Sequence, residues 1–598
     1  MAVLAVIIST TLVVAAVAAG SGGTTAPGAV STGAAPPTGG VAVPYQFIAK
    51  AYTELLGRGP TGPEWSSAVA YFVRHGCTAS SLSSFGTGIV GSREYAADYP
   101  RSDPAPIVLT LYRFILNREP GPAGFVTTRD ALALGVAPVA EATALFSGAE
   151  FTGTTGPAVC NPADPSDFFG EPGDLTGHPA IQTPGSGAPG PDSPEAVLQR
   201  RLDEAASGGG TVSLPARQVV GLTTTLVVPG GVTLTTVGGP DPTRYADMAR
   251  LVRVTGYAGG ALVQVGPGAR LEHVWVDGQR DAPDPNDPSV FNVRMMGGTG
   301  TTVRDDRLGN PYGASNLEAD GASSGVGGAT ACSDNVISDN LVEAYASAHT
   351  VPPGQPSSDH PESDGLGIYC HDARVEGNTL VDVSDAGIVL FDGAALGATA
   401  PPQLSVVADN TIISAGNSMY WGIVTDPGYS LAAAGHPGGD PAGVTTRRYA
   451  AGGHAAEIIG NRIWSGDRTH IDVVLAVGTH ALFGSVLHQD CYLPNRAGVA
   501  ACGGGRNLLG GRWSGNSSAG QLVEVEMGIY VGGADGATVT GNRFPDLVEV
   551  TGGSCPKHPV VVVTGNGGST DFARRLRIDV PFFRDTAAAS DICVTPTY

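Results

Sequence analysis

The sequence predicts a mainly β protein, in which a right-handed parallel β-helix follows a small all-α domain. Three observations support this prediction. A short motif ending in asparagine recurs through the C-terminal half, glycine accounts for 87 of the 598 residues, and helical periodicity is concentrated near the N-terminus. Repeats with a period of roughly 20–50 residues are typical of solenoids, and abundant glycine favours tight turns between short strands.

Composition and charge limit the class of partner. Hydrophobic residues make up 42% of the chain, which is enough for a large core. The chain has 33 basic and 55 acidic residues, giving a formal charge of −22, and its only lysines are Lys50 and Lys557. Because such a surface repels phosphate backbones, we expect no nucleic-acid partner. A neutral glycan fits this charge better than a polyanionic one, unless metal ions or an arginine cluster screen the repulsion.

The N-terminal segment is typical of export. Residues 1–19 form an apolar run that ends in Ala-Val-Ala-Ala, and a Gly-, Ser-, Thr- and Pro-rich stretch follows over residues 20–43. This order predicts a signal peptide and then a flexible linker, although the usual basic residue before the apolar run is missing. The alternative is a short membrane anchor. Both interpretations place the rest of the protein outside the cell, secreted or at the cell surface, with no other membrane contact.

Eight cysteines agree with an oxidising compartment. Their spacing is not that of a zinc site, since no two of them form a C-x-x-C unit. We therefore predict disulfide bonds rather than metal ligation. The predicted pairs are Cys77–Cys160, Cys332–Cys370, Cys491–Cys502 and Cys555–Cys593.

Residues 44–158 are predicted to form a duplicated all-α module. Apolar residues recur there at helical spacing. Residues 51–60 match residues 111–120 at an offset of 60, and residues 92–95 match residues 148–151 at an offset of 56. Each copy would be a helix that ends at an Arg-x-Pro turn and is followed by further helices.

The repeated motif resembles an uncharacterised bacterial module of secreted and surface-associated proteins. The shared features are Leu-Tyr-Arg, the Arg-x-Pro turn and a closing Ser-x-Glu-Phe or Ser-x-Glu-Tyr. The resemblance implies a surface-attachment or partner-binding role for this part of the chain. Arg58 and Arg118 could contact a ligand in such a role, but we favour the interpretation that they stabilise the turn.

The β-helix is expected over residues 193–598, after a second Pro/Gly-rich linker at residues 159–192. Ser193-Pro194-Glu195 is a helix start, with proline in the first turn and a carboxylate at the positive end of the helix. The short helix runs into a glycine turn and an apolar strand at residues 208–215. This order resembles the N-terminal cap of pectin-lyase-like β-helices, in which a helix covers the open end of the solenoid.

The repeated coils are recognised by a motif that ends in asparagine. Asparagine tolerates left-handed backbone geometry, and stacked asparagine side chains can bond along a ladder. Cys332 and Cys370 each lie eight residues before such an asparagine, so stacking would place them about 5 Å apart, within disulfide range. A Pro-rich loop at residues 350–361 accounts for their long spacing. The five copies of the motif are residues 336–340, 374–378, 406–410, 457–461 and 538–542.

A candidate site follows from three glycine-led strands, aligned as residues 367–371, 387–391 and 422–426. Side chains alternate faces along a strand, so with Ile368, Ile388 and Ile423 inside, a polar and aromatic column faces outward. That column contains His371, Phe391 and Asp426, with Asp392 one step beyond Phe391; Asp364 and Asp385 precede the first two strands, and Tyr420 and Trp421 precede the third.

The column suggests glycoside cleavage. Carboxylates on adjacent coils would be about 5 Å apart and diagonal ones further, which suits the two carboxylates of a glycosidase. Asp392 and Asp426 would act as acid and base, or acid and nucleophile, with Asp364 as a further catalytic candidate. The residues expected to bind substrate are His371, Phe391, Tyr420, Trp421 and Asp385.

Other interpretations of these residues remain open. Each aspartate could instead cap a turn, and Trp421 could belong to the core. Arg468, His470 and Asp472 would extend the groove by one coil. Asp305 and Asp306 could bind calcium, but we favour a solvated loop and predict no metal or other cofactor.

Over roughly residues 193–598 the chain resembles pectin-lyase-like proteins, which include hydrolases, lyases, epimerases and adhesins. The polygalacturonase-like set is absent, because Asp305-Asp306 stands without its partner motifs. No acidic cluster with a following arginine base of the pectate-lyase kind occurs either. The mechanism therefore cannot be carried over. We predict a glycoside hydrolase that acts on a polysaccharide; a polysaccharide lyase and a non-enzymatic, glycan-binding surface protein are the alternatives.

Overall fold

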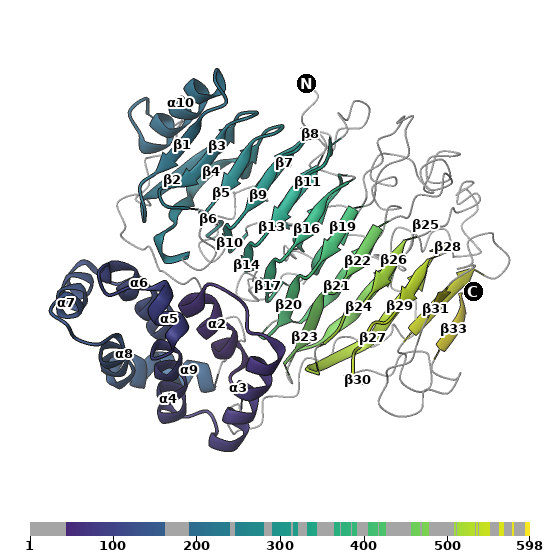
Figure 1. The fold of residues 1–598 in the computed structure, drawn as a ribbon, viewed down its shortest axis with the longest axis horizontal. Helices are drawn as coiled ribbons and strands as arrows, with labels where there is room; N and C mark the ends of the chain where they lie inside the picture. Colours follow the sequence, from purple (N-terminus) through teal and green to yellow (C-terminus); the bar gives the residue numbers. More distant parts are fainter. Residues whose placement is uncertain are drawn as a thin grey trace, which may run out of the picture.

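The fold is a long solenoid with a helical module on its flank (Figure 1). No helix of the described part is both long and apolar enough to cross a membrane. The predicted signal segment, most of both linkers and the Pro-rich loop lie outside the described residues. The computed structural model describes residues 43–161, 190–239, 245–279, 290–311, 315–320, 332–343, 364–370, 372–383, 385–390, 405–416, 418–425, 456–466, 469–477, 508–509, 511–518, 520–532, 534–535, 537–549, 561–566, 577–578 and 592–597.

The solenoid contains three columns of strands, and paired strands in the described part run parallel. The A column is an 11-stranded sheet. Its strands are β1 (Thr211–Leu214), β3 (Thr233–Thr236), β5 (Arg270–Glu272), β9 (Thr302–Arg304), β13 (Val336–Ser338), β16 (Arg374–Glu376), β19 (Ser405–Ala408), β22 (Ala456–Ile459), β26 (Arg512–Ser514), β29 (Thr538–Thr540) and β32 (Arg577–Ile578).

The B and C columns belong to one 18-stranded sheet, because its long strands bend across both columns. The long strands are β2 (Val219–Val228), β4 (Ala249–Val265) and β27 (Leu522–Gly532). The other B strands are β6 (Val274–Asp277), β10 (Arg307–Gly309), β14 (Leu341–Glu343), β17 (Thr379–Val381), β20 (Thr411–Ser414), β23 (Arg462–Ser465) and β30 (Asp546–Glu549). The other C strands are β7 (Phe291–Met296), β11 (Ser315–Asp320), β15 (Asp364–Ile368), β18 (Ala386–Leu390), β21 (Met419–Thr425), β24 (Ile471–Val477), β31 (Val561–Asn566) and β33 (Ile592–Thr597).

This arrangement is the predicted parallel β-helix. One coil runs from an A strand through a B strand to a C strand, and the next coil begins at the next A strand. Two short pairs join neighbouring coils outside the columns. They are β8 (Gly298–Thr299) with β12 (Cys332–Ser333), and β25 (Leu508–Leu509) with β28 (Ala534–Asp535).

An asparagine ladder fixes the corner between the A and B columns. In each coil the buried Nδ2 group donates to the Oδ1 atom of the next asparagine at 2.8–2.9 Å and to a backbone carbonyl of the preceding coil. The ladder was predicted and is confirmed, and Asn516 joins the five predicted asparagines. Its members are Asn340, Asn378, Asn410, Asn461, Asn516 and Asn542.

The left-handed residue of this corner is not the asparagine. Positive φ occurs at the residue before it, for example at Asp339 (58°), Gly377 (70°) and Asp409 (55°). The prediction that asparagine itself takes this geometry is therefore wrong. The preceding residue makes the sharp turn, and that turn aims the asparagine side chain along the solenoid axis.

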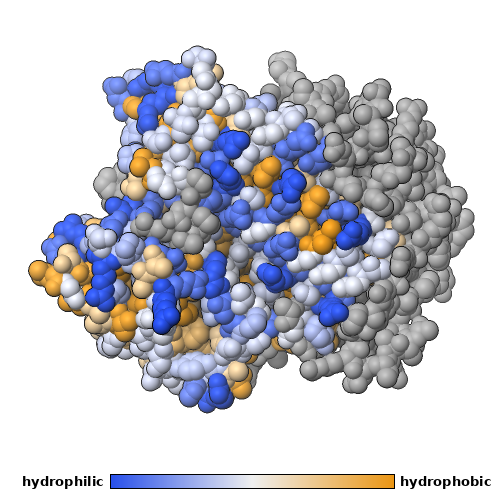
Figure 2. All heavy atoms as spheres, viewed as in Figure 1, coloured by the Kyte–Doolittle hydropathy of each residue, from blue (hydrophilic) through white to orange (hydrophobic). Residues whose placement is uncertain are grey.

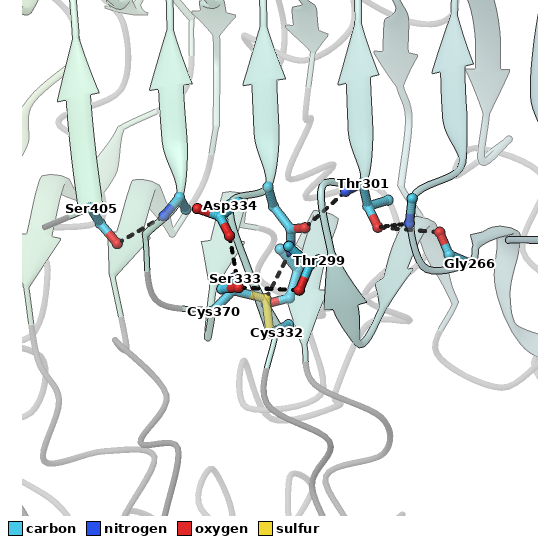
Figure 3. Close-up of a disulfide and its surroundings, with 12 residues drawn as sticks. Gly266, Thr299, Thr301, Cys332, Ser333, Asp334, Cys370 and Ser405 are labelled. Carbon is cyan, nitrogen blue, oxygen red and sulfur yellow. Dashed lines mark hydrogen bonds between the residues drawn. A yellow bond between two sulfur atoms is a disulfide. The ribbon is translucent and has the colours of Figure 1, made fainter. Parts of the chain in front are cut away.

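The disulfide between Cys332 and Cys370 confirms the stacking of the coils (Figure 3). The two Cα atoms are 4.9 Å apart although 38 residues separate them. A second polar ladder lies beside this bond, where Asn335 Oδ1 accepts from the Thr301 backbone amide at 3.2 Å and Ser405 Oγ accepts from the Ala373 amide at 3.2 Å. Neighbouring coils are thus tied together at this corner also.

The other predicted disulfides have different outcomes. Cys77–Cys160 is present, with its Cα atoms 5.5 Å apart. Cys491, Cys502 and Cys555 lie outside the described residues, so the pairs Cys491–Cys502 and Cys555–Cys593 stay predictions.

Helices precede the solenoid, and the last of them covers its first coil. The covering helix, α10 (Pro194–Ala206), packs on β2, and its Glu195 accepts from the backbone amides of Thr223 and Thr224 at 3.0 and 2.9 Å. A 3₁₀ turn, η4 (Tyr245–Asp247), lies between β3 and β4. The earlier helices are α2 (Tyr45–Leu56), α3 (Gly62–His75), α4 (Ala79–Val90), α5 (Arg93–Asp98), α6 (Pro104–Leu116), α7 (Pro122–Ala133), α8 (Pro138–Ser147), η2 (Phe151–Thr155) and α9 (Gly156–Cys160).

Two equivalent arginines follow the first helix of each sequence repeat. Arg58 Nε pairs with Glu94 at 2.6 Å, and Arg118 Nε pairs with Glu150 at 2.5 Å. Arg58 also binds Glu64 at 2.8 Å. These ion pairs join the turn to later helices of the same repeat, which is the stabilising role favoured above.

The helical module docks along the B column, and α2 lies against several successive coils. Gln46 Nε2 donates to Asp382 at 3.2 Å, Glu54 pairs with Arg307 at 2.5 Å, and a Cβ atom on Gly466 would lie 2.9 Å from the Tyr45 ring. All residues of α2 are buried. The apolar core therefore continues from the helices into the solenoid.

Buried charges occupy the centre of this interface. The Trp275 ring lies 4.1 Å from the guanidinium carbon of Arg307 and 3.9 Å from that of Arg250. Arg307 is fully buried and binds Glu54 and Glu343. The expected solvated loop at Asp305 and Asp306 is wrong, because both residues are buried in the turn between β9 and β10. The described residues hold no group of three metal-ligating side chains.

Candidate functional site

The predicted site residues fall into two groups. Asp392, Asp426, His371 and Phe391 lie outside the described residues, as does Arg468. The structure describes the other four, and all of them lie at the corner where the B column turns into the C column. These are Asp364, Asp385, Tyr420 and Trp421.

The register at this corner differs by two residues from the predicted alignment. Leu366 pairs with Ile388, so Gly365 rather than Gly367 is level with Gly387. Ile368 therefore pairs with Leu390, and the predicted alignment of Ile368 with Ile388 is wrong. His371 and Phe391 themselves lie outside the described residues. A shift of two residues preserves the alternation of faces, so the hydrophobic pattern could not reveal it.

Glycine is required at this point of three successive coils, those of Gly365, Gly387 and Gly422. A Cβ atom on Gly365 would lie 2.5 Å from the carbonyl oxygen of Gly387, and one on Gly387 would lie 2.5 Å from that of Gly422. These distances leave no room for a side chain at the three glycines. The B–C corner is thus a tightly packed edge. Asp364 and Trp421, which precede Gly365 and Gly422, are partly exposed there, whereas Ala386 is buried.

An aromatic pair stands on this edge. The Tyr420 and Trp421 rings have centroids 5.4 Å apart and planes inclined by 42°. Trp421 is half-buried and packs against an apolar cluster that contains Val389 and Val424. Tyr420 is 39% exposed and is the one aromatic residue among the exposed large hydrophobic residues of the described part. Most of the others are valine and leucine in the helical module, where Figure 2 shows orange surface.

Backbone pairing sets the aromatic pair between two aspartates. Trp421 is level with Ala386 on one side and with Val473 on the other. Tyr420 consequently lies between Asp385 and Asp472, on neighbouring coils about 4.8 Å apart. The Tyr420 and Trp421 amides both donate to the Asp385 carbonyl oxygen, at 3.0 and 3.1 Å.

Asp364 has the geometry of a turn-capping residue. Its Oδ1 atom accepts from the Ala386 amide at 3.1 Å, and its Oδ2 atom accepts from Ser315 Oγ at 3.3 Å. The carboxylate therefore joins three successive coils. This corresponds to the capping alternative, and a catalytic role for Asp364 stays a prediction.

A serine and a histidine complete the surface. Ser418 Oγ lies 3.0 Å from His470 Nδ1, and His470 Nε2 lies 2.9 Å from Asp472 Oδ1. Sequence reasoning placed His470 and Asp472 next to the groove but missed Ser418, because a lone serine before a strand has no distinguishing pattern. We call Asp364, Asp385, Ser418, Tyr420, Trp421, His470 and Asp472 the corner cluster.

The corner cluster is distant from the far ends of the C strands. Thr425, the last residue of β21, is five positions after Tyr420, which is about 17 Å of extended chain. Asp392 and Asp426 follow the ends of β18 and β21 in the sequence. A long polysaccharide, but not a single sugar ring, could contact the corner cluster and the ends of these strands together.

No family model and no curated protein matches this chain. Solved structures with a similar fold include the tailspike protein of Escherichia coli bacteriophage HK620 in complex with a pentasaccharide. It is 13% identical, with a TM-score of 0.35, over 67% of this chain and 70% of the tailspike chain. The A-module of a mannuronan C-5 epimerase from Azotobacter vinelandii is also 13% identical, with a TM-score of 0.31, over 70% of this chain and 98% of that module. Similarity at this level carries no information about activity.

Proposed function

We propose that the protein is a secreted or cell-surface protein that binds a polysaccharide along the B–C corner and cleaves it as a glycoside hydrolase. The observation that carries the proposal is the Tyr420–Trp421 pair, with Tyr420 exposed and Trp421 half-buried, on the edge between Asp385 and Asp472. Aromatic rings give sugar rings an apolar stacking surface. Flanking carboxylates can accept hydrogen bonds from sugar hydroxyl groups.

The charge of the protein favours a neutral glycan. The chain carries a formal charge of −22, and three aspartates lie in the corner cluster. An anionic polysaccharide would meet like charges at this surface. The disulfides Cys77–Cys160 and Cys332–Cys370 agree with an extracellular location.

Asp392 and Asp426 remain the proposed acid and base, or acid and nucleophile. Both follow C strands whose other ends support the corner cluster. A polysaccharide bound by Tyr420 and Trp421 could extend along the outer face of these strands. In this proposal, one polysaccharide chain stacks on the aromatic pair and is cleaved at the two aspartates, which lie at a different place on the protein.

The test is a screen of neutral and acidic polysaccharides for new reducing ends. Wild-type protein should release them from a neutral glycan, and Asp392→Asn or Asp426→Asn should lower turnover by at least about 100-fold. Full turnover in both variants would show that the catalytic assignment is wrong. An unsaturated product that absorbs in the near ultraviolet would indicate a lyase instead. Binding without any product would indicate a glycan-binding surface protein.

A further inference from the structure

We propose that Ser418, His470 and Asp472 form a nucleophilic centre that hydrolyses acyl esters carried by a glycan. The choice of a glycan ester as substrate rests on the proposed function, whereas the nucleophilic centre rests on its own geometry. Nucleophilic serines are recognised by a hydrogen-bonded base that is itself oriented by a third group. The distances of 3.0 Å from Ser418 to His470 and 2.9 Å from His470 to Asp472 satisfy this requirement.

The hydrogen bonds select the reactive arrangement of protons. Ser418 Oγ accepts from the His470 backbone amide at 3.2 Å. The hydroxyl proton of Ser418 is therefore available for donation to His470 Nδ1. Donation from Nε2–H to the Asp472 carboxylate then gives a neutral imidazole with its basic nitrogen toward the serine.

The backbone holds this arrangement across two coils. The Met419 amide donates to the His470 carbonyl oxygen at 2.9 Å, and Met419 pairs with Ile471 in the parallel ladder. Ser418 and His470 are thus fixed by residues that directly adjoin them. A nucleophile and base on rigid strands keep the separation that proton transfer needs.

The centre is accessible to a substrate. Ser418 is exposed, and the side chains of His470 and Asp472 are 30% and 23% exposed. Tyr420 is next to Asp472 on the neighbouring coil. A sugar that stacks on Tyr420 would therefore carry its substituents toward Ser418.

The reaction would follow acyl transfer. Ser418 Oγ attacks the ester carbonyl carbon while its proton moves to His470 Nδ1, and the imidazolium returns that proton to the departing sugar oxygen. Water then attacks the acyl-serine with His470 as base and releases the carboxylic acid. The amides of Met419, Tyr420 and Trp421 are used in interstrand bonds and cannot form an oxyanion hole. Since one such donor is worth roughly 10²–10³ in rate, we expect a slow esterase.

Covalent labelling tests the centre without knowledge of the glycan. A fluorophosphonate probe should modify the full-length protein on the peptide that contains Ser418. Ser418→Ala should abolish this label, and His470→Gln or Asp472→Asn should slow it by at least about 100-fold. Ser147→Ala, which changes an exposed serine bonded to the Thr143 carbonyl, should leave the label unchanged. Thermal unfolding of each variant checks that the fold is retained.

Two outcomes would overturn the proposal. They are the absence of label on Ser418, and labelling that is unchanged in folded His470→Gln protein. The substrate class is then tested by measuring acetate release from an acetylated neutral polysaccharide. Wild-type protein should release acetate, and Ser418→Ala should not. New reducing ends are measured in the same reactions, so failure of the esterase is distinguishable from failure of the glycosidase. Labelling of Ser418 without acetate release would show that the substrate is not an acetylated glycan, while the assignment of Ser418 as a nucleophile would stand.

Discussion

At the residue scale, an aspartate occupies the position before the first asparagine of the ladder. Asp306 precedes Asn340 in the ladder: its amide donates to Asn340 Oδ1 at 2.9 Å, and its Oδ1 atom accepts from the Val274 amide at 2.7 Å. Its Oδ2 atom has no hydrogen-bond partner among the described residues. Burial raises the pKa of Asp306 well above its ordinary value, because the charged carboxylate loses its hydration in the folded state.

Asp306→Asn should therefore stabilise the protein at neutral pH. A carboxyl group with a raised pKa in the folded state stabilises the folded protein fully only at pH values below its pKa in the unfolded state. This contribution to stability is lost as the pH rises toward the pKa of the folded state. The asparagine amide does not ionise, so its contribution to stability does not fall as the pH rises, and it restores an Nδ2 donor. We therefore expect the free energy of unfolding at pH 7 to increase by about 1–2 kcal/mol. Urea unfolding at pH 7 and pH 3.5 measures it. The gain in stability should shrink at the lower pH, and an equal gain at both pH values would contradict a raised pKa of Asp306 in the folded state.

At the element scale, stacked corners rather than long strands hold the coils in register. Most A and B strands have only three or four residues. The ladder asparagines and the close-packed glycines at the B–C corner supply the contacts that such short strands lack. Asparagine and glycine each suit the backbone geometry of one corner of the coil, and both recur in the sequence. The fold class was therefore predictable.

Register was less predictable than fold class. Gly365 and Gly367 are separated by two residues, and either fits the pattern of a glycine that leads an apolar strand. Only the contact between Gly365 and the Gly387 carbonyl selects the first of them. The left-handed residue was misassigned for a similar reason, because Asp339 and Asn340 are adjacent and both residue types tolerate that geometry.

Asn410→Ala should destabilise the middle of the ladder. Its Oδ1 atom accepts from the backbone and side chain of Asn378, and its Nδ2 group donates to Val375 and Asn461. Removing these bonds leaves buried partners unsatisfied, so we expect a loss of about 3–5 kcal/mol in the free energy of unfolding. Asn161→Ala, at an exposed helix end, is the control and should cost less than about 1 kcal/mol. A comparable effect of the two substitutions would show that the ladder does not hold the coils.

At the scale of the whole molecule, the polar face of one helix joins the two parts. Gln46, Lys50 and Glu54 give α2 a polar face, and all three are buried. Burial lowers the pKa of Lys50 to about 8. Gln46 and Glu54 bind Asp382 and Arg307, which are hundreds of residues away in the sequence. Neither periodicity nor a motif links such positions, so the docking could not be predicted.

Arg307→Met tests this joint. The substitution leaves Glu54 and Glu343 buried without their shared arginine, and loss of one partner from a buried ion pair costs about 3–5 kcal/mol. Arg129→Met, which removes an exposed pair with Asp130, should cost about 1 kcal/mol or less. Denaturant unfolding followed by far-ultraviolet circular dichroism gives both values. Equal losses of unfolding free energy in the two variants would contradict a stabilising role for the buried ion pairs between the helical module and the solenoid.

The corner cluster is the part of the molecule on which the functional account depends, and a glycan array tests it most directly. Labelled wild-type protein and the Tyr420→Ala/Trp421→Ala double variant are applied to the same set of neutral, amino and acidic polysaccharides, with Tyr71→Ala as an aromatic control in the helical module. Loss of two stacking side chains at roughly 1–1.5 kcal/mol each should weaken binding to neutral glycans by about 30–150-fold, and the control should bind like wild type. Undiminished binding by the double variant, or binding restricted to acidic glycans, would contradict the account.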